Sequence, residues 1–219
     1  MGTFIIFTLE TSLALLAGYV VYKWLLASQN QPGFNRLVLL AIYALSLLAY
    51  PLLHIDFRAA HEPSEVVFDL PMASGAAIVA AEPHKASIVP AIIAGAYISG
   101  AVAVLLSTFA TAMRLRRVAA SGLISRERGY KLAIIHNSEI APFSWGRVIV
   151  MSEADYEESG NVILAHERAH VAKRHFLDLM VAQAFCVLMW YNPASWLMLR
   201  ELRAVHEYQP DAQVLKAGI

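Results

Sequence analysis

The sequence predicts a mainly α-helical membrane protein, in which three N-terminal transmembrane helices precede a small α+β domain. Hydrophobic residues make up 58% of the chain and charged residues only 16%, which is more apolar than an average soluble domain. Long uncharged runs fill the first half, whereas the second half alternates between short β-prone runs and helical patterns. The formal net charge is zero, so nothing indicates a nucleic-acid partner.

The transmembrane region is predicted to cover residues 1–113, with the lipid bilayer as its partner. Its apolar runs are 4–27, 37–53 and 86–113. The first and third are long enough to cross the hydrocarbon core with some tilt, and the second is short but uncharged. Residues 56–86 between the second and third runs form a loop rich in acidic side chains.

Loop charges predict the orientation of these helices, because short cytoplasmic loops carry the excess of lysine and arginine. The first loop contains Lys23 and Arg36 and no acidic residue. The third apolar run is followed by Arg114, Arg116 and Arg117. We therefore expect the N-terminus and the acidic loop to lie outside the cell, and the second half of the chain to lie in the cytoplasm.

The cytoplasmic domain is predicted to cover residues 114–219. Two β-prone runs, 131–136 and 146–152, flank a segment that contains proline and precedes a glycine, so they predict a short β-hairpin or a small sheet. A helical pattern begins near Ala154 and extends to about Phe176. A further apolar run and a last helix complete the domain.

The predicted helix contains the pattern H-E-x-x-H, formed by His166, Glu167 and His170. Residues four apart share one face of a helix, so both imidazoles can bind a single Zn²⁺ ion. Glu167 lies beside that face and can act as the general base. The same residues also fit an ordinary solvated helix face, on which Arg168 and Lys173 are further charges.

A catalytic zinc needs a third protein ligand. Two glutamates follow the motif, and we expect Glu207 and not Glu201, because Asp211 lies four residues after Glu207 and can orient a ligand from behind. If the apolar run 176–199 crossed the membrane, Glu207 would lie on the opposite side from the histidines. This run is therefore predicted to be a bent helical hairpin that turns at its Asn-Pro step.

The segment around residues 143–149 can form an edge strand to which an extended peptide substrate adds as a further strand. Phe143, Ser144 and Trp145 are then candidate substrate-binding residues, although a buried aromatic in a β-bulge explains Trp145 equally well. The candidates for stabilising the oxyanion, by proximity in sequence alone, are His175, His206 and Tyr208.

Besides the H-E-x-x-H motif, five longer blocks of sequence are spread over most of the chain: "FNRLVLL", "APFSWGRVIVMS", "ILAHERAHVAKRHFLDL", which contains the motif, "WYNPASWLMLREL" and "HEYQPDAQVL". In this order they resemble the BlaR/MecR-type integral-membrane zinc metallopeptidases, which are bacterial signal-transducing proteases. The resemblance implies a gluzincin-like domain in the bacterial cytoplasmic (inner) membrane, with its active site on the cytoplasmic side. It also implies His166, His170 and Glu207 as zinc ligands and Glu167 as the catalytic base.

The predicted function is that of a membrane-embedded zinc-dependent endopeptidase in transmembrane signalling. Its substrate is a regulatory protein, such as a cytoplasmic transcriptional repressor, or the chain itself. Zinc would polarise the scissile carbonyl and activate a water, and Glu167 would transfer the water's proton to the leaving amine.

Two departures from the family pattern favour a different interpretation. Pro210 stands where the family usually has alanine, and proline removes a backbone hydrogen bond and can kink the helix that carries Glu207. The chain ends at Ile219, where family members usually continue into a further span and a sensor, so we expect a fragment or a minimal member. The alternative function is a non-proteolytic membrane signalling or scaffold protein with a structural or degenerate metal site.

Overall fold

The computed structural model describes residues 2–29, 31–54 and 88–217, with side chains as far as Tyr208. The helices are α1 (Gly2–Leu25), α2 (Pro32–Leu53), α3 (Val89–Ser121), α4 (Glu153–Ala172), α5 (His175–Leu188) and α6 (Pro193–Ala217). The strands are β1 (Leu123–Glu127), β2 (Tyr130–Ile135), β3 (Phe143–Trp145) and β4 (Val148–Ser152). The predicted acidic loop, 56–86, lies outside the described residues.

Helices α1, α2 and α3 are each long and apolar enough to cross a membrane. The prediction of three apolar spans is therefore confirmed at the level of length and composition. Helix α3 extends beyond Met113, the predicted end of the third apolar span, and continues to Ser121. The reason is that the arginine-rich stretch after Met113 consists of good helix formers and contains neither glycine nor proline.

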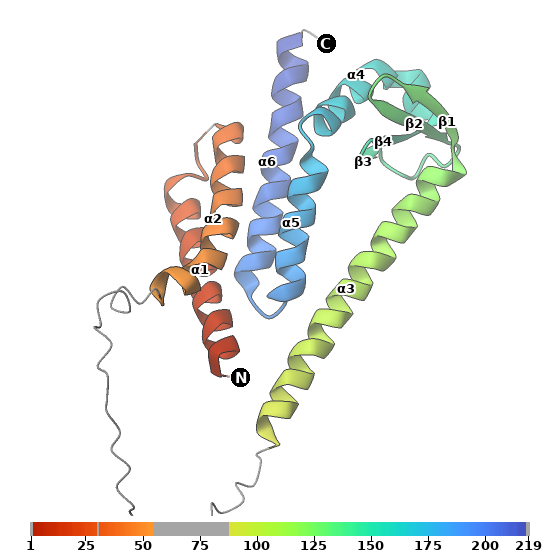
Figure 1. Ribbon diagram of the computed structural model, residues 1–219. Helices are drawn as coiled ribbons and strands as arrows, with labels where there is room; N and C mark the ends of the chain where they lie inside the picture. Colours follow the sequence, from red (N-terminus) through yellow and green to blue (C-terminus); the bar gives the residue numbers. More distant parts are fainter. Residues whose placement is uncertain (1, 30, 55–87, 218–219) are drawn as a thin grey trace, which may run out of the picture.

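Figure 1 shows α1 and α2 side by side on one flank of the α5–α6 pair, with α3 on the other flank. The sheet and α4 lie at one end, where α3 leads into β1. A fully buried cluster joins the first flank to the centre, and it includes Leu15, Leu39 and Tyr43 from α1 and α2, and Met198 and Leu202 from α6. The first two helices therefore pack directly against the helix that carries Glu207.

The small sheet is mixed and has the strand order β1-β2-β4-β3. The prediction of a small sheet is confirmed. The prediction that the runs 131–136 and 146–152 form one hairpin is wrong, because β2 and β4 pair in parallel, with Ala133 opposite Val150. Two hairpins exist instead, β1 with β2 and β3 with β4. Gly146 makes the second turn with a φ of 63°, which glycine adopts without strain.

Strand β1 was not predicted from the sequence, because it lacks an alternating apolar pattern. All five of its residues are exposed, so it pairs with β2 through the backbone and buries no face. It closes one edge of the sheet, and β3 occupies the other edge. The strand predicted to receive a substrate therefore lies at a sheet edge.

The break between α4 and α5 also differs from the prediction, which extended one helix to Phe176. Helix α4 ends at Ala172, and Arg174 follows in the left-handed region with a φ of 55°. The Arg36 guanidinium accounts for this end, since Nη2 donates a hydrogen bond to the carbonyl of Lys173 at 2.9 Å. Helix α5 then starts in a new direction.

Helices α5 and α6 form the hairpin within the apolar run 176–199, and the chain reverses between Leu188 and Pro193. Asn192 caps the second helix, because its Oδ1 accepts a hydrogen bond from the backbone N–H of Ala194 at 2.9 Å. Proline at the first helical position costs nothing, since its missing donor would have no partner there. The reversal brings the middle of α6 back beside α4.

Candidate metal centre

Three candidate metal ligands from two helices meet at one point. His166 and His170 lie one turn apart on α4, and their Nε2 atoms are 3.1 Å from each other. Glu207 comes from α6, with Oε2 at 3.6 Å from His166 Nε2 and at 3.9 Å from His170 Nε2. The structure thus brings together the three residues that sequence reasoning selected as zinc ligands.

The donor atoms of His166, His170 and Glu207 fit a tetrahedral zinc ion. Zinc–ligand bonds of about 2.0–2.1 Å at tetrahedral angles place neighbouring donors about 3.3 Å apart. The three donor separations, 3.1, 3.6 and 3.9 Å, bracket that value. The set of two imidazoles and one carboxylate leaves a fourth position for water or substrate, which is the arrangement of a catalytic site.

Glu167 lies beside these ligands and is buried, with 7% of its surface exposed. Burial raises the pKa of its carboxyl group, because desolvation disfavours the charged form. A hydrogen bond from Ser144 opposes this rise in pKa, and so does the neighbouring His166. A carboxyl group with a raised pKa is suited to accept a proton and then to release it.

Comparison with protein families identifies the family of the chain. The profile described as BlaR1 peptidase M56 matches residues 37–218, from within α2 to the end of α6. The chain belongs to this family of BlaR1-type M56 peptidases. The resemblance predicted from the five sequence blocks is therefore confirmed. A comparison with curated proteins finds no match.

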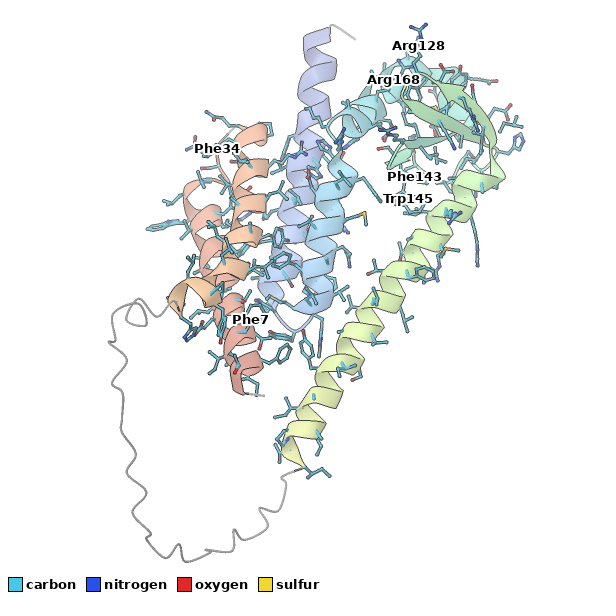
Figure 2. All side chains as sticks on the ribbon, in the orientation of Figure 1. Phe7, Phe34, Arg128, Phe143, Trp145 and Arg168 are labelled. Atoms are coloured by element: carbon cyan, nitrogen blue, oxygen red, sulfur yellow. The ribbon has the colours of Figure 1, made fainter. Side chains whose placement is uncertain are left out.

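In this M56 chain, a cleft opens next to the three candidate ligands. Strand β3 forms one wall of the cleft with Phe143, Ser144 and Trp145, and Glu167 and Glu207 line it as well. Figure 2 shows Phe143 and Trp145 beside the sheet, at the end of the molecule where α3 meets it. The Trp145 ring meets Phe176 of α5 edge-to-face, with ring centroids 5.9 Å apart. The candidate substrate-binding residues and the candidate catalytic residues therefore share one cavity.

The oxyanion candidates occupy different environments. His175 and His206 are buried and stacked on each other, with ring centroids 4.0 Å apart and parallel planes. Burial, Arg36 and His170 together lower the pKa of His206 to about 4, so its imidazole is neutral. Tyr208 is 67% exposed. Both buried histidines have protein partners: His206 Nε2 lies 3.0 Å from Asp178 Oδ2, and His175 Nδ1 lies 2.7 Å from His170 Nδ1.

Sequence reasoning missed two residues of this environment, Asp178 and Arg36. Asp178 accepts a hydrogen bond from His206 Nε2 at 3.0 Å. It also forms an ion pair with Arg36, whose Nε lies 2.8 Å from its Oδ2. The available signal was a lone acid within an apolar helix, together with a lone arginine at the start of an apolar span. Charged groups in such positions are costly unless paired, so each predicts a partner.

The remaining predictions concern α6. Glu201, the rejected ligand, pairs with Lys23 of α1 at 2.7 Å and lies outside the metal centre. The backbone of α6 stays helical through position 210 as far as Ala217, so Pro210 does not end the helix. The side chain of Asp211, predicted to orient a ligand, lies outside the described side chains.

Proposed function

We propose that this M56 peptidase is a membrane-embedded, zinc-dependent endopeptidase of the gluzincin type that acts in transmembrane signalling. His166, His170 and Glu207 hold the zinc, and Glu167 is the general base. One observation carries the proposal: two imidazoles and a carboxylate from separate helices converge at tetrahedral spacing beside a buried glutamate. A solvated helix face does not require this convergence.

Bound zinc would supply a Lewis acid that lowers the pKa of a water and polarises the scissile carbonyl. The Glu167 carboxylate accepts the proton of the attacking water while the water oxygen bonds to the carbonyl carbon. Glu167 then delivers this proton to the amide nitrogen as the C–N bond breaks, which yields a carboxylic acid and an amine; the acid keeps the second proton of the water and then loses it to the solvent. The hydrogen bond from Ser144 holds the carboxylate in place for both transfers.

The substrate is an extended segment of a regulatory protein, or of a second copy of the chain. Strand β3 supports this proposal, because it lies at the edge of the sheet and lines the cleft next to Glu167. An extended peptide can pair with this edge through backbone hydrogen bonds and place one side chain against Trp145 and Phe176. The apolar ring pair favours an apolar or aromatic side chain at that position.

The proposed location is the bacterial cytoplasmic membrane, with the metal centre on the cytoplasmic side. The arginines at positions 114, 116 and 117 support this orientation, because they lie in the last part of α3, directly before the sheet. Basic residues near the end of a span favour the cytoplasmic face. Lys23 and Arg36 flank the turn between α1 and α2 and support the same orientation.

Zinc stoichiometry and peptide cleavage, measured on the detergent-purified chain, test this function. We expect one zinc per chain in the wild type and in Glu167→Gln, and loss of zinc in Glu207→Ala. A library of quenched fluorescent peptides should be cut by the wild type, whereas Glu167→Gln should be inactive with its zinc retained. Glu201→Gln is the matched control on α6 and should behave like the wild type. Zinc binding that is indifferent to Glu207, or full cleavage by Glu167→Gln, would instead support a structural metal site.

A further inference from the structure

We propose that Arg36 of α2 is a positioning residue that couples the membrane-spanning helices to the metal centre, through Asp178 and the two buried histidines. This inference rests on the proposed function, because it assigns a role toward the same metal ligands. It adds a specific route by which a change in the position of α2 reaches His170 and Glu207.

The route begins with two parallel hydrogen bonds between Arg36 and Asp178 of α5. Arg36 Nε lies 2.8 Å from Asp178 Oδ2, and Nη2 lies 3.2 Å from Oδ1. Both side chains are largely shielded from solvent, with 24% and 10% of their surfaces exposed. This paired geometry fixes the guanidinium plane relative to the carboxylate, which a single contact from lysine cannot do.

The same guanidinium also holds the helix that carries the histidine ligands. Arg36 Nη2 donates to the carbonyl of Lys173, which caps the C-terminus of α4 at 2.9 Å. A cation at this end of a helix satisfies a free carbonyl and interacts favourably with the helix dipole. Arg36 thus fixes the end of α4 and the start of α5 at one point, three residues after His170.

From Asp178 the route continues to the helix that carries the third ligand. His206 Nε2 donates to Asp178 Oδ2 at 3.0 Å, and both side chains are buried. His206 directly precedes Glu207 on α6. The carboxylate of Asp178 therefore fixes the rotation of α6 at the residue next to the carboxylate ligand.

His175 completes the route to the histidine ligands. Its Nδ1 lies 2.7 Å from Nδ1 of His170, and its ring stacks on that of His206. If His170 binds zinc through Nε2, its proton must reside on Nδ1, which then donates to His175. Such a hydrogen bond sets both the tautomer and the ring orientation of a metal ligand.

Arg36 matters because its helix belongs to the membrane region. Helix α2 packs against α1 and α6, so a shift of the first two helices displaces the guanidinium relative to α4 and α5. Loss of the paired hydrogen bonds would release Asp178, and with it His206 and the stacked His175. The expected result is a looser ligand set and weaker zinc binding, while the three ligands themselves remain intact.

The test is zinc affinity of the full chain in detergent, measured by competition with a chromophoric chelator. Removing a group that orients a ligand usually lowers metal affinity about 10- to 100-fold. We expect about tenfold weaker binding in Arg36→Gln. Asp178→Asn should bind zinc at least as weakly as Arg36→Gln. The variant that carries both substitutions should bind zinc no more weakly than Asp178→Asn, because both residues act along one route. Visible absorption of the Co²⁺-loaded protein should also change in both variants, which reports ligand geometry directly.

Lys23→Gln is the matched control, since it removes an ion pair between another N-terminal helix, α1, and α6, away from the metal centre. Its zinc affinity should stay within about twofold of the wild type, the size expected for an exposed pair. Arg36→Lys keeps the charge without the paired geometry and should be intermediate; it decides the question if Arg36→Gln does not fold. If the Arg36 variants bind zinc as tightly as the wild type, or if Lys23→Gln loses as much zinc affinity as Arg36→Gln, the coupling is refuted but the metal site is not. A wild-type chain that binds neither zinc nor cobalt would refute the metal site itself.

Discussion

The hydrogen bond from Ser144 to Glu167 should control the acidic limb of the pH–activity profile. A hydrogen bond to a charged group contributes about 1.5–3 kcal/mol, and one pKa unit corresponds to about 1.4 kcal/mol. Ser144→Ala should therefore raise the pKa of Glu167 further, because the charged form loses a hydrogen bond that stabilises it. Burial already raises this pKa, and the hydrogen bond is the largest influence that lowers it.

The sign follows from the role of Glu167, which must be deprotonated to accept a proton. A higher pKa leaves less carboxylate at low pH, so the acidic limb of kcat/KM should move to higher pH. The assay is the pH dependence of cleavage of one fluorescent peptide. Ser144→Thr keeps the hydroxyl and should follow the wild-type profile. An unchanged limb in Ser144→Ala, or an equal shift in Ser144→Thr, would show that Ser144 does not tune this carboxyl group.

Three further predictions concern the metal, the packing of α3 and the cleft. Zinc at about 100 times its Kd should stabilise the wild type by about 2.7 kcal/mol against thermal unfolding. Chelation, or Glu207→Ala, should remove this effect. Gly100→Ala should lower stability by about 1–3 kcal/mol, because the new Cβ would lie 2.2 Å from the Trp190 ring. Gly95→Ala is the control, because its new Cβ would have no heavy atom within 4 Å, so its melting temperature should equal or exceed that of the wild type. A Gly100→Ala variant that melts at the same temperature as Gly95→Ala would contradict this packing. Trp145→Ala should lower kcat/KM roughly 10- to 100-fold with unchanged zinc affinity, as for loss of one apolar subsite. Unchanged cleavage kinetics would remove Trp145 from the substrate site.

Features with a short-range cause could be predicted from the sequence. The three apolar spans depend on composition and length alone, and the H-E-x-x-H spacing places two imidazoles on one helix face wherever that helix packs. The choice of Glu207 over Glu201 also followed from residues on the same helix. The structure separates these two glutamates in the same way, with Glu207 at the metal centre and Glu201 paired with Lys23.

Strand pairing could not be predicted in the same way. Each β-prone run was located within a residue or two, but the partner of a strand depends on the chain between the runs. Here that chain forms β3, which takes the antiparallel edge of β4 and leaves β2 to pair with β4 in parallel. Strand β1 has no apolar pattern at all, because it forms only backbone hydrogen bonds at an exposed edge.

The sequence by itself determined the family, through five blocks spread along the chain. It also predicted the apolar spans from composition, and the candidate ligands from spacing along each of two helices. Only the tertiary structure decided how these ligands are held. The contact between Arg36 and Asp178 joins residues 142 positions apart, and His206 reaches Asp178 across 28. The sequence does not show which other charge a buried charged residue pairs with. The fold must bring Arg36 and Asp178 together, because burying either charge without its partner would be costly.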